Sequence, residues 1–242
     1  MIPASNLTDY LREQALHLDL TDLQIAVMTL QAVIAVDKPA PSRDLYRYKV
    51  PKLGEGGSCS LFNELDEAPY DLRVALGVET AETTAGLVNL YALLDSVNAK
   101  IGADWLGIYR KIGVGKSAVL VKLAYKGVES RAEFPLTEEF AEFSNNSRVG
   151  LSGWAVLVDD VAKWREEGGG YYECDPKVKS EVCLPVLHSD DNVLGIIDAE
   201  SFQPCHFSPE RLVWLAALAI VLPQLLVKLP PLALENGEIL PN

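Results

Sequence analysis

The sequence predicts an α+β fold in which helices cover an antiparallel sheet, preceded by a helical N-terminal extension. Strand-like segments occur in adjacent pairs joined by short polar or glycine-containing turns, which is typical of antiparallel hairpins. Segments with apolar residues at helical spacing stand before and after these pairs. Hydrophobic residues make up 49% of the 242 residues and charged residues 23%, which suits a chain that buries a core.

Residues 1–75 are expected to form the helical extension and a connector. Near the start, apolar residues recur at helical spacing, and Thr21 with Gln24 then fits a capping box ahead of the apolar run IAVMTLQAVIAV. Residues 37–58 are rich in Pro, Gly, Lys and Arg and predict a connector. A short helix is expected over residues 71–77.

Residues 76–228 are expected to form one compact domain, followed by a short tail at 229–242. The predicted elements are a helix at 85–101, strands at 105–112, 117–127, 180–187 and 193–201, and a helix that begins after Ser208. Ser208, Pro209 and Glu210 supply a cap, a first-turn proline and a first-turn acid for that last helix. Residues 128–155 show a mixed pattern, and no helix or strand is assigned to them.

Composition and charge exclude several classes of partner. The formal net charge of −13, with no basic run, argues against nucleic acid. The first residues lack a basic segment followed by an apolar stretch, so no export signal is expected and the predicted location is cytoplasmic. Residues 212–227 form the longest apolar stretch; because it contains Pro223 and is short for a membrane span, it favours a buried core helix.

Two motifs favour plain structural interpretations. The four cysteines form no CxxC pair, so no metal and no cofactor is expected, and in a reducing compartment each thiol is a core filler, a redox thiol or a nucleophile. The run GVGKS at 113–117 is similar to a phosphate-binding loop, but Arg110 stands where that loop needs glycine. A hairpin turn is therefore expected there.

Acidic residues in the last strand pair are candidates for a site. Asp198 and Glu200 are two apart, so both lie on one face of their strand, and Glu181 and Cys183 have the same relation on the paired strand. Three carboxylates at one mouth would bind an ammonium group or share a proton with a ligand oxygen. The alternative is that this face is simply solvated, and the spacing does not separate the two interpretations.

Several motifs carry a resemblance to a known family. The stretches DWLGIY, VGLSGWA, YYECDPKVKSEVCLPV and VLGIIDAES, followed by F-S-P-E and a helix, resemble the GAF-domain family over residues 80–225. Within that family the pattern looks most like the free methionine-(R)-sulfoxide reductases. The resemblance implies a GAF-like antiparallel sheet with flanking helices and a small-molecule ligand such as free methionine sulfoxide.

The resemblance also implies roles for particular residues. The cysteine of the family's Cys-Asp pair is the nucleophile, which falls on Cys174. Its carboxylates fall on Glu181, Asp198 and Glu200, the last of which is commonly aspartate in the family. The family's aromatic wall near the substrate methyl group falls on Trp105 and Tyr109.

One departure concerns the family's two further cysteines. Their positions are occupied by Ser152 and approximately Glu142, so the usual resolving thiol is absent. A sulfenic acid formed on Cys174 needs a second thiol to return to the reduced state. Cys183 and Cys59 are the candidates within the chain, and a thioredoxin-like or other external thiol is the alternative.

The sequence therefore leaves three hypotheses open. The first is a thiol-based reductase of a small sulfoxide. The second is a GAF module that binds or senses a small molecule without catalysis. The third is a structural domain used for dimerisation, in which apolar helices such as those at 21–35 and 209–227 pair between two copies.

Overall fold

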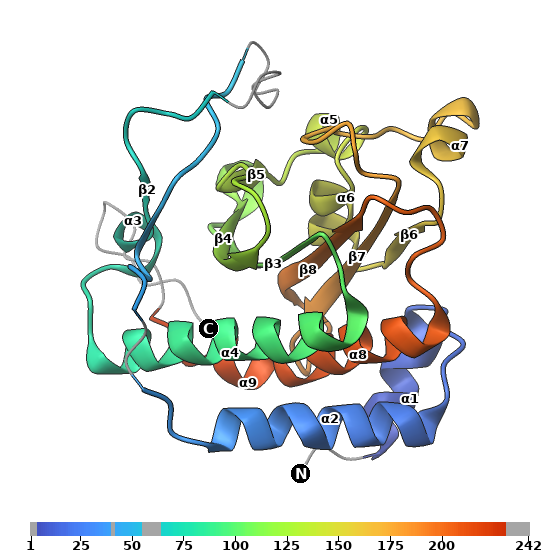
Figure 1. Ribbon diagram of the computed structural model, residues 1–242, viewed down its shortest axis with the longest axis horizontal. Helices are drawn as coiled ribbons and strands as arrows, with labels where there is room; N and C mark the ends of the chain where they lie inside the picture. Colours follow the sequence, from blue (N-terminus) through green and yellow to red (C-terminus); the bar gives the residue numbers. More distant parts are fainter. Residues whose placement is uncertain (1–3, 40–41, 55–63, 231–242) are drawn as a thin grey trace.

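Six strands form one antiparallel sheet in the computed structural model, which describes residues 4–39, 42–54 and 64–230 (Figure 1). They are β3 (Trp105–Ile112), β4 (Val119–Lys126), β5 (Glu133–Pro135), β6 (Val156–Val158), β7 (Ser180–Leu187) and β8 (Val193–Ser201). Their order across the sheet is β5-β4-β3-β8-β7-β6. The α+β prediction is confirmed, and so are the bounds predicted for β3, β7 and β8.

The turn between β3 and β4 shows why the phosphate-loop motif has no such role. Gly113 and Gly115 adopt φ angles of 79° and 56°, a left-handed conformation that favours glycine, and a short 3₁₀ turn spans Gly115–Ser117. The segment joins two strands as a hairpin, as predicted. Because this turn occupies its first residues, β4 begins at Val119 rather than at residue 117.

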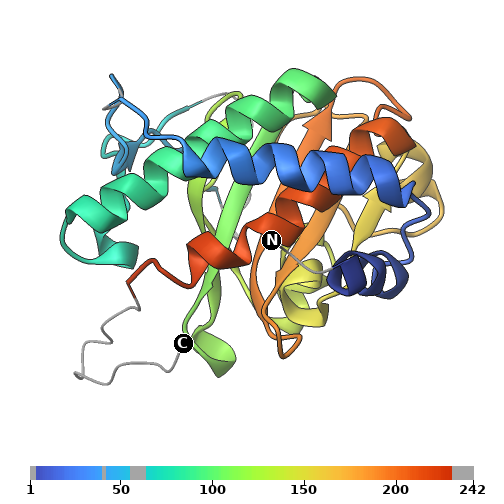
Figure 2. The ribbon, with the colours of Figure 1, turned by 90° about the horizontal axis from the view of Figure 1, so that it is seen from below.

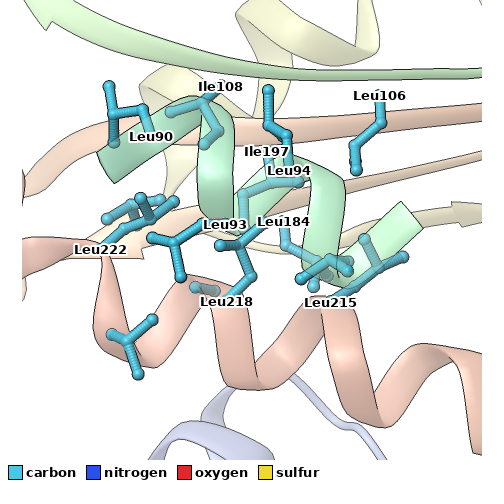
Figure 3. Packing of buried hydrophobic residues seen from close by; sticks show 14 of the residues in the cluster. Leu90, Leu93, Leu94, Leu106, Ile108, Leu184, Ile197, Leu215, Leu218 and Leu222 are labelled. Atoms are coloured by element: carbon cyan, nitrogen blue, oxygen red, sulfur yellow. The ribbon is translucent and has the colours of Figure 1, made fainter. Parts of the chain in front are cut away.

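Two long helices cover one face of the sheet. α4 (Ala81–Ile101) begins where the Thr80 side chain accepts from the backbone of Thr83, four residues earlier than predicted, and ends at the left-handed Gly102. α8 (Pro209–Val221) begins after Ser208 with a first-turn proline, as predicted, and is followed by α9 (Pro223–Leu226). Figure 3 shows leucines of α4 and α8 packed against inward-facing residues of the central strands.

The N-terminal helices add a further layer. α1 (Ala4–Glu13) and α2 (Leu20–Ala35) precede the sheet, and α2 lies across α4 and α8 on the side away from the strands (Figure 2). The predicted cap of α2 is wrong by two residues: Asp19, rather than Thr21, accepts a hydrogen bond from Asp22 N at 3.0 Å. The buried side of α2 belongs to the same apolar cluster as α4, α8 and the sheet.

The connector also contains regular structure. β1 (Arg47–Tyr48) pairs with β2 (Tyr70–Asp71), and α3 (Arg73–Leu76) follows directly. The helix predicted over 71–77 is therefore shorter, because Asp71 pairs in β2 and Gly77 ends the helix with a φ of 72°.

Short elements occupy the opposite face and rim of the sheet, and the first two of them lie within residues 128–155, for which no element was predicted. They are α5 (Glu138–Ala141), α6 (Asn145–Ser152) and α7 (Val161–Glu166). Each begins at a side-chain cap, supplied by Thr137, Ser144 and Asp160 respectively. In Figure 1 they lie across the sheet from α4 and α8.

The C-terminal apolar segment is part of the core. Pro209–Leu226 is long and apolar enough to cross a membrane by length and composition alone, but 61% of it is buried within the protein. This burial against the sheet and α2 is typical of the core helix of a folded domain, as the sequence predicted.

Candidate functional site

The strand register brings the predicted acidic residues together on the face opposite α4 and α8. Glu181 on β7 pairs with Glu200 on β8, and Cys183 pairs with Asp198. On the other side of β8, Trp105 of β3 pairs with Glu200. Because alternate residues of a strand point to opposite faces, all five side chains share one face of the sheet.

A polar cavity lies on this face, between the sheet and the loops that cross it. It is lined by Trp105, Tyr109, Ser130, Phe134, Ser144, Asn145, Asn146, Tyr172, Cys174, Glu181, Asp198 and Glu200. The structure thus gathers the nucleophile candidate, the three carboxylates and both aromatic residues, which come from segments far apart in the sequence. Its volume is about 30 Å³, room for one or two water molecules.

Glu181 and Asp198 form a buried acidic pair. They are only 5% and 3% exposed, so of the two interpretations left open the solvated face does not apply to these two residues, whereas Glu200 is half-buried. Burial is the first cause that raises both pKa values, and the charge of Asp198 raises that of Glu181 further. The pair therefore holds at least one proton at neutral pH and can donate it.

Neighbouring groups limit these shifts. The Tyr171 hydroxyl donates to Glu181, and Arg148 and Asn145 also lower the pKa of Glu181. Asn146 Nδ2 donates to Asp198 Oδ2 at 2.9 Å, and the buried Lys122 ammonium lowers the pKa of Asp198.

Trp105 and Tyr109 form an aromatic wall of the cavity. Their ring centroids are 6.2 Å apart, and Trp105 Nε1 donates to the carbonyl of Val128 at 3.1 Å. Gly107 makes this position possible, because a Cβ there would lie 2.2 Å from the Trp105 ring. Burial, and then the charges of Asp198 and Cys174, raise the pKa of Tyr109 well above its usual value, so its hydroxyl stays protonated.

Cys174 lies on the segment between α7 and β7 that crosses the cavity. The thiol is half-buried, in contrast to the fully buried Cys183. Gly169 and Gly170 hold the start of this segment close to its neighbours, since a Cβ would meet the Trp164 ring at 2.3 Å and the Glu142 carbonyl oxygen at 1.8 Å. Farther along the segment, Tyr172 and Cys174 line the cavity.

Of the two candidate resolving thiols, Cys183 is the one that the structure describes. Cys183 is fully buried, does not line the cavity, and donates through Sγ to Asn146 Oδ1 at 3.3 Å. Burial and the nearby Asp198 and Glu181 raise its pKa, which disfavours the thiolate needed for attack. Cys59 lies outside the described residues.

Sequence reasoning missed half of the lining. The missed residues are Ser130, Phe134, Ser144, Asn145 and Asn146, which lie within residues 128–155, and Tyr172, which lies in the motif that also contains Cys174. The run SNNSR at 144–148 carried one usable signal, because Ser144 is a good helix cap. Burial of the two asparagines depends on docking α6 against β8 and was not readable locally.

This architecture is an α+β domain with a curled antiparallel sheet, a helical layer on one face and a polar cavity on the other. The chain belongs to the GAF domain family, whose sequence model matches residues 88–223. No curated protein sequence matches the chain. The fold predicted from sequence is thereby confirmed at the level of the family.

Solved structures with the same fold include enzymes and other GAF domains. A type II free methionine-R-sulfoxide reductase from Thermoplasma acidophilum is 23% identical with a TM-score of 0.52, over 61% of this chain and 96% of that one. A free methionine-R-sulfoxide reductase from Neisseria meningitidis in complex with its substrate is 22% identical with a TM-score of 0.49, over 59% and 78%. The GAF domain of an Acinetobacter phosphoenolpyruvate-protein phosphotransferase is 18% identical with a TM-score of 0.46, over 59% and 82%.

Proposed function

We propose that this protein reduces a small sulfoxide, such as free methionine-(R)-sulfoxide, with Cys174 as the nucleophile. The observation that carries the proposal is one cavity that combines a half-buried thiol, a protonated acidic pair and an aromatic wall. The carboxylates suit the ammonium group of a free amino acid. Trp105 and Tyr109 suit the methyl group of its side chain.

The chemistry balances with these groups alone in the first half-reaction. The Cys174 thiolate attacks the sulfoxide sulfur and forms a sulfur–sulfur bond, while a carboxyl of the acidic pair protonates the sulfoxide oxygen. The hydroxyl group then passes from the substrate sulfur to Cys174 Sγ as the new sulfur–sulfur bond breaks. The sulfoxide is reduced to a sulfide by two electrons. Cys174 is oxidised by two electrons and keeps the oxygen as a sulfenic acid.

An external thiol completes the cycle. It condenses with the sulfenic acid to give a mixed disulfide and water, and a second equivalent releases reduced Cys174 and a disulfide. The burial of Cys183 and its raised pKa favour this route over an internal one. A thioredoxin-like protein or a small thiol would supply the reductant.

Ligand entry requires the segment over the cavity to open. The cavity volume of about 30 Å³ is far below the roughly 300 Å³ at the lower end of ligand pockets. Cys174 and Tyr172 lie on the segment between α7 and β7, which also contains the glycine run 168–170. Displacing this segment would enlarge the cavity without disturbing the sheet.

The test is turnover of each methionine sulfoxide epimer with a thiol reductant. We expect methionine from the R epimer only, and none from Cys174→Ser. Cys205→Ser is the matched control, because Cys205 is exposed and does not line the cavity. Absence of methionine from either epimer, with the wild-type protein folded and its thiols reduced, would reject the proposal.

A second candidate function is ligand sensing without catalysis. The burial of Cys183 favours it, because a sensor needs no resolving thiol. Signals would pass through α2, which packs on α4 and α8. Thermal stabilisation by methionine sulfoxide, with the ligand recovered unchanged in the presence of thiol, would support sensing over reduction.

A further inference from the structure

A buried arginine stands next to the cavity and takes no part in the chemistry described above. Arg131 lies on the loop between β4 and β5 and is only 6% exposed. Its neighbour Ser130 lines the cavity, whereas Arg131 itself does not. Because a buried charge is costly unless its donors have partners, the contacts of Arg131 indicate what it does.

The guanidinium of Arg131 holds the Tyr172 side chain in two ways. Nη1 donates to the Tyr172 hydroxyl at 2.9 Å, and the guanidinium carbon lies 5.3 Å from the centre of the same ring. The guanidinium is itself held in place, since Nε donates to the Glu133 carbonyl. Its carbon also lies 4.9 Å from the ring centre of Phe134 and 5.0 Å from that of Phe140. Arg131 therefore presents its donor to Tyr172 in a fixed direction.

Three phenylalanines surround the same tyrosine. The Tyr172 ring centre lies 5.9 Å from that of Phe134, 5.4 Å from that of Phe140 and 6.2 Å from that of Phe143. Phe134 belongs to β5, and the other two lie on α5 and just after it. Together with Arg131 these three residues form what we call the Tyr172 socket. Its members pack by ring contacts, while the hydrogen bond from Arg131 fixes the hydroxyl end of the ring.

The Tyr172 socket matters to the site because of what lies two residues farther along. Tyr172 and Cys174 belong to the segment between α7 and β7, and both line the cavity. Two residues of chain span at most about 7 Å, so the place of Tyr172 limits where the Cys174 thiol can lie.

Two other contacts hold this segment, both from the side of α7 and β7. Arg165 Nη1 pairs with Glu173 at 2.8 Å, but these side chains are 44% and 36% exposed, so water weakens the pair. The Tyr171 hydroxyl donates to Glu181 of β7. Arg131 holds the segment from the other half of the sheet, where β5 and β4 lie.

We propose that Arg131 is a positioning residue, which through Tyr172 holds Cys174 at the cavity and keeps its thiol half covered. The role of Cys174 as nucleophile rests on the proposed function, whereas the contacts of Arg131 do not depend on it. The segment opening that ligand entry requires would break the bond from Arg131 to Tyr172.

The test measures the rate at which iodoacetamide alkylates Cys174, followed by mass spectrometry of the peptide that contains it. A half-covered thiol reacts mainly when its surroundings open, so the rate follows the opening equilibrium. Tyr172→Phe removes only the hydroxyl that Arg131 holds, and loss of a hydrogen bond to a charged group should raise the rate about tenfold.

Arg131→Met should raise the Cys174 rate at least as much. Loss of a cation disfavours a thiolate and would by itself slow alkylation, so a faster reaction cannot be an effect of charge. The double variant with Tyr172→Phe should be no faster than the faster single variant, because both changes break one bond. An unchanged or slower rate in either folded single variant, or multiplied effects in the double variant, overturns the proposal.

Cys183 separates positioning from general support of the fold. It is fully buried on β7, so its alkylation reports loosening of the sheet. Positioning predicts a faster reaction at Cys174 alone, and equal rises at both thiols overturn it. Tyr91→Phe is the matched control, because it removes the hydroxyl of a buried tyrosine on α4 and should leave the Cys174 rate unchanged. A rise there as large as in Tyr172→Phe also overturns the proposal.

Alkylation needs no turnover, so this test and the reduction assay can fail independently. If no methionine forms but the Cys174 rate rises as expected, the positioning role stands and the proposed function falls. If methionine forms and the Cys174 rate stays unchanged, the proposed function stands and the positioning role falls.

Discussion

The buried acidic pair makes the stability of this protein depend on pH in the direction opposite to that of most carboxylates. The perturbation is Glu181→Gln, which keeps the side-chain shape and removes the titration. Burial, and then the charge of Asp198, raise the pKa of Glu181 to about 8 from an ordinary value of 4.5. A group whose folded pKa lies above its unfolded pKa binds more protons when folded. It stabilises the protein at low pH, and this stabilisation is lost as pH rises between the two values.

The magnitude follows from the linkage slope. Between pH 5.5 and 7.5 the unfolded Glu181 is ionised and the folded one remains largely protonated, so each pH unit lowers the free energy of unfolding by about 1.4 kcal/mol. Over this interval the wild type should lose about 3 kcal/mol that Glu181→Gln retains. For a chain of this size that corresponds to roughly 6–12 °C in melting temperature.

The assay is thermal and urea unfolding of both proteins across this pH range. Glu166→Gln is the control, because Glu166 is an exposed glutamate on α7 and should leave the pH dependence unchanged. Parallel stability curves for the wild type and Glu181→Gln would refute the argument, since they would mean that Glu181 titrates alike in the folded and unfolded states.

Three further predictions test the packing and the thiols. Asp19→Ala should cost about 1 kcal/mol through loss of the α2 cap, measured by urea unfolding, while Thr21→Ala should be nearly neutral. Gly107→Ala should destabilise by about 1–3 kcal/mol, because its methyl group would clash with the Trp105 ring. In the Trp105→Leu background the same change should cost less, and equal costs in the two backgrounds would contradict the clash. Cys183→Ser should leave turnover with an external thiol unchanged, whereas loss of recycling after one turnover would identify Cys183 as the resolving thiol.

The sequence by itself determined the strand pairs, the two covering helices and the family. Alternation along residues 180–187 and 193–201 is local information, and the turn between them leaves antiparallel pairing as the simple solution. The same alternation placed Glu181, Asp198 and Glu200 on one face. The resemblance to the GAF-domain family pointed to Cys174 and the aromatic wall.

Only the tertiary structure decided whether that face of the sheet is solvated or buried. Whether acidic side chains are solvated or buried depends on what covers them, and the cover comes from α6 and the segment that carries Cys174, both distant in sequence from β7 and β8. The need for glycine at position 107 likewise depends on a neighbour, the Trp105 ring, and not on the local sequence pattern. Burial raises the pKa values of the acidic pair, and burial is a property of the assembled fold, so the chemistry of the cavity could not be read from residue spacing.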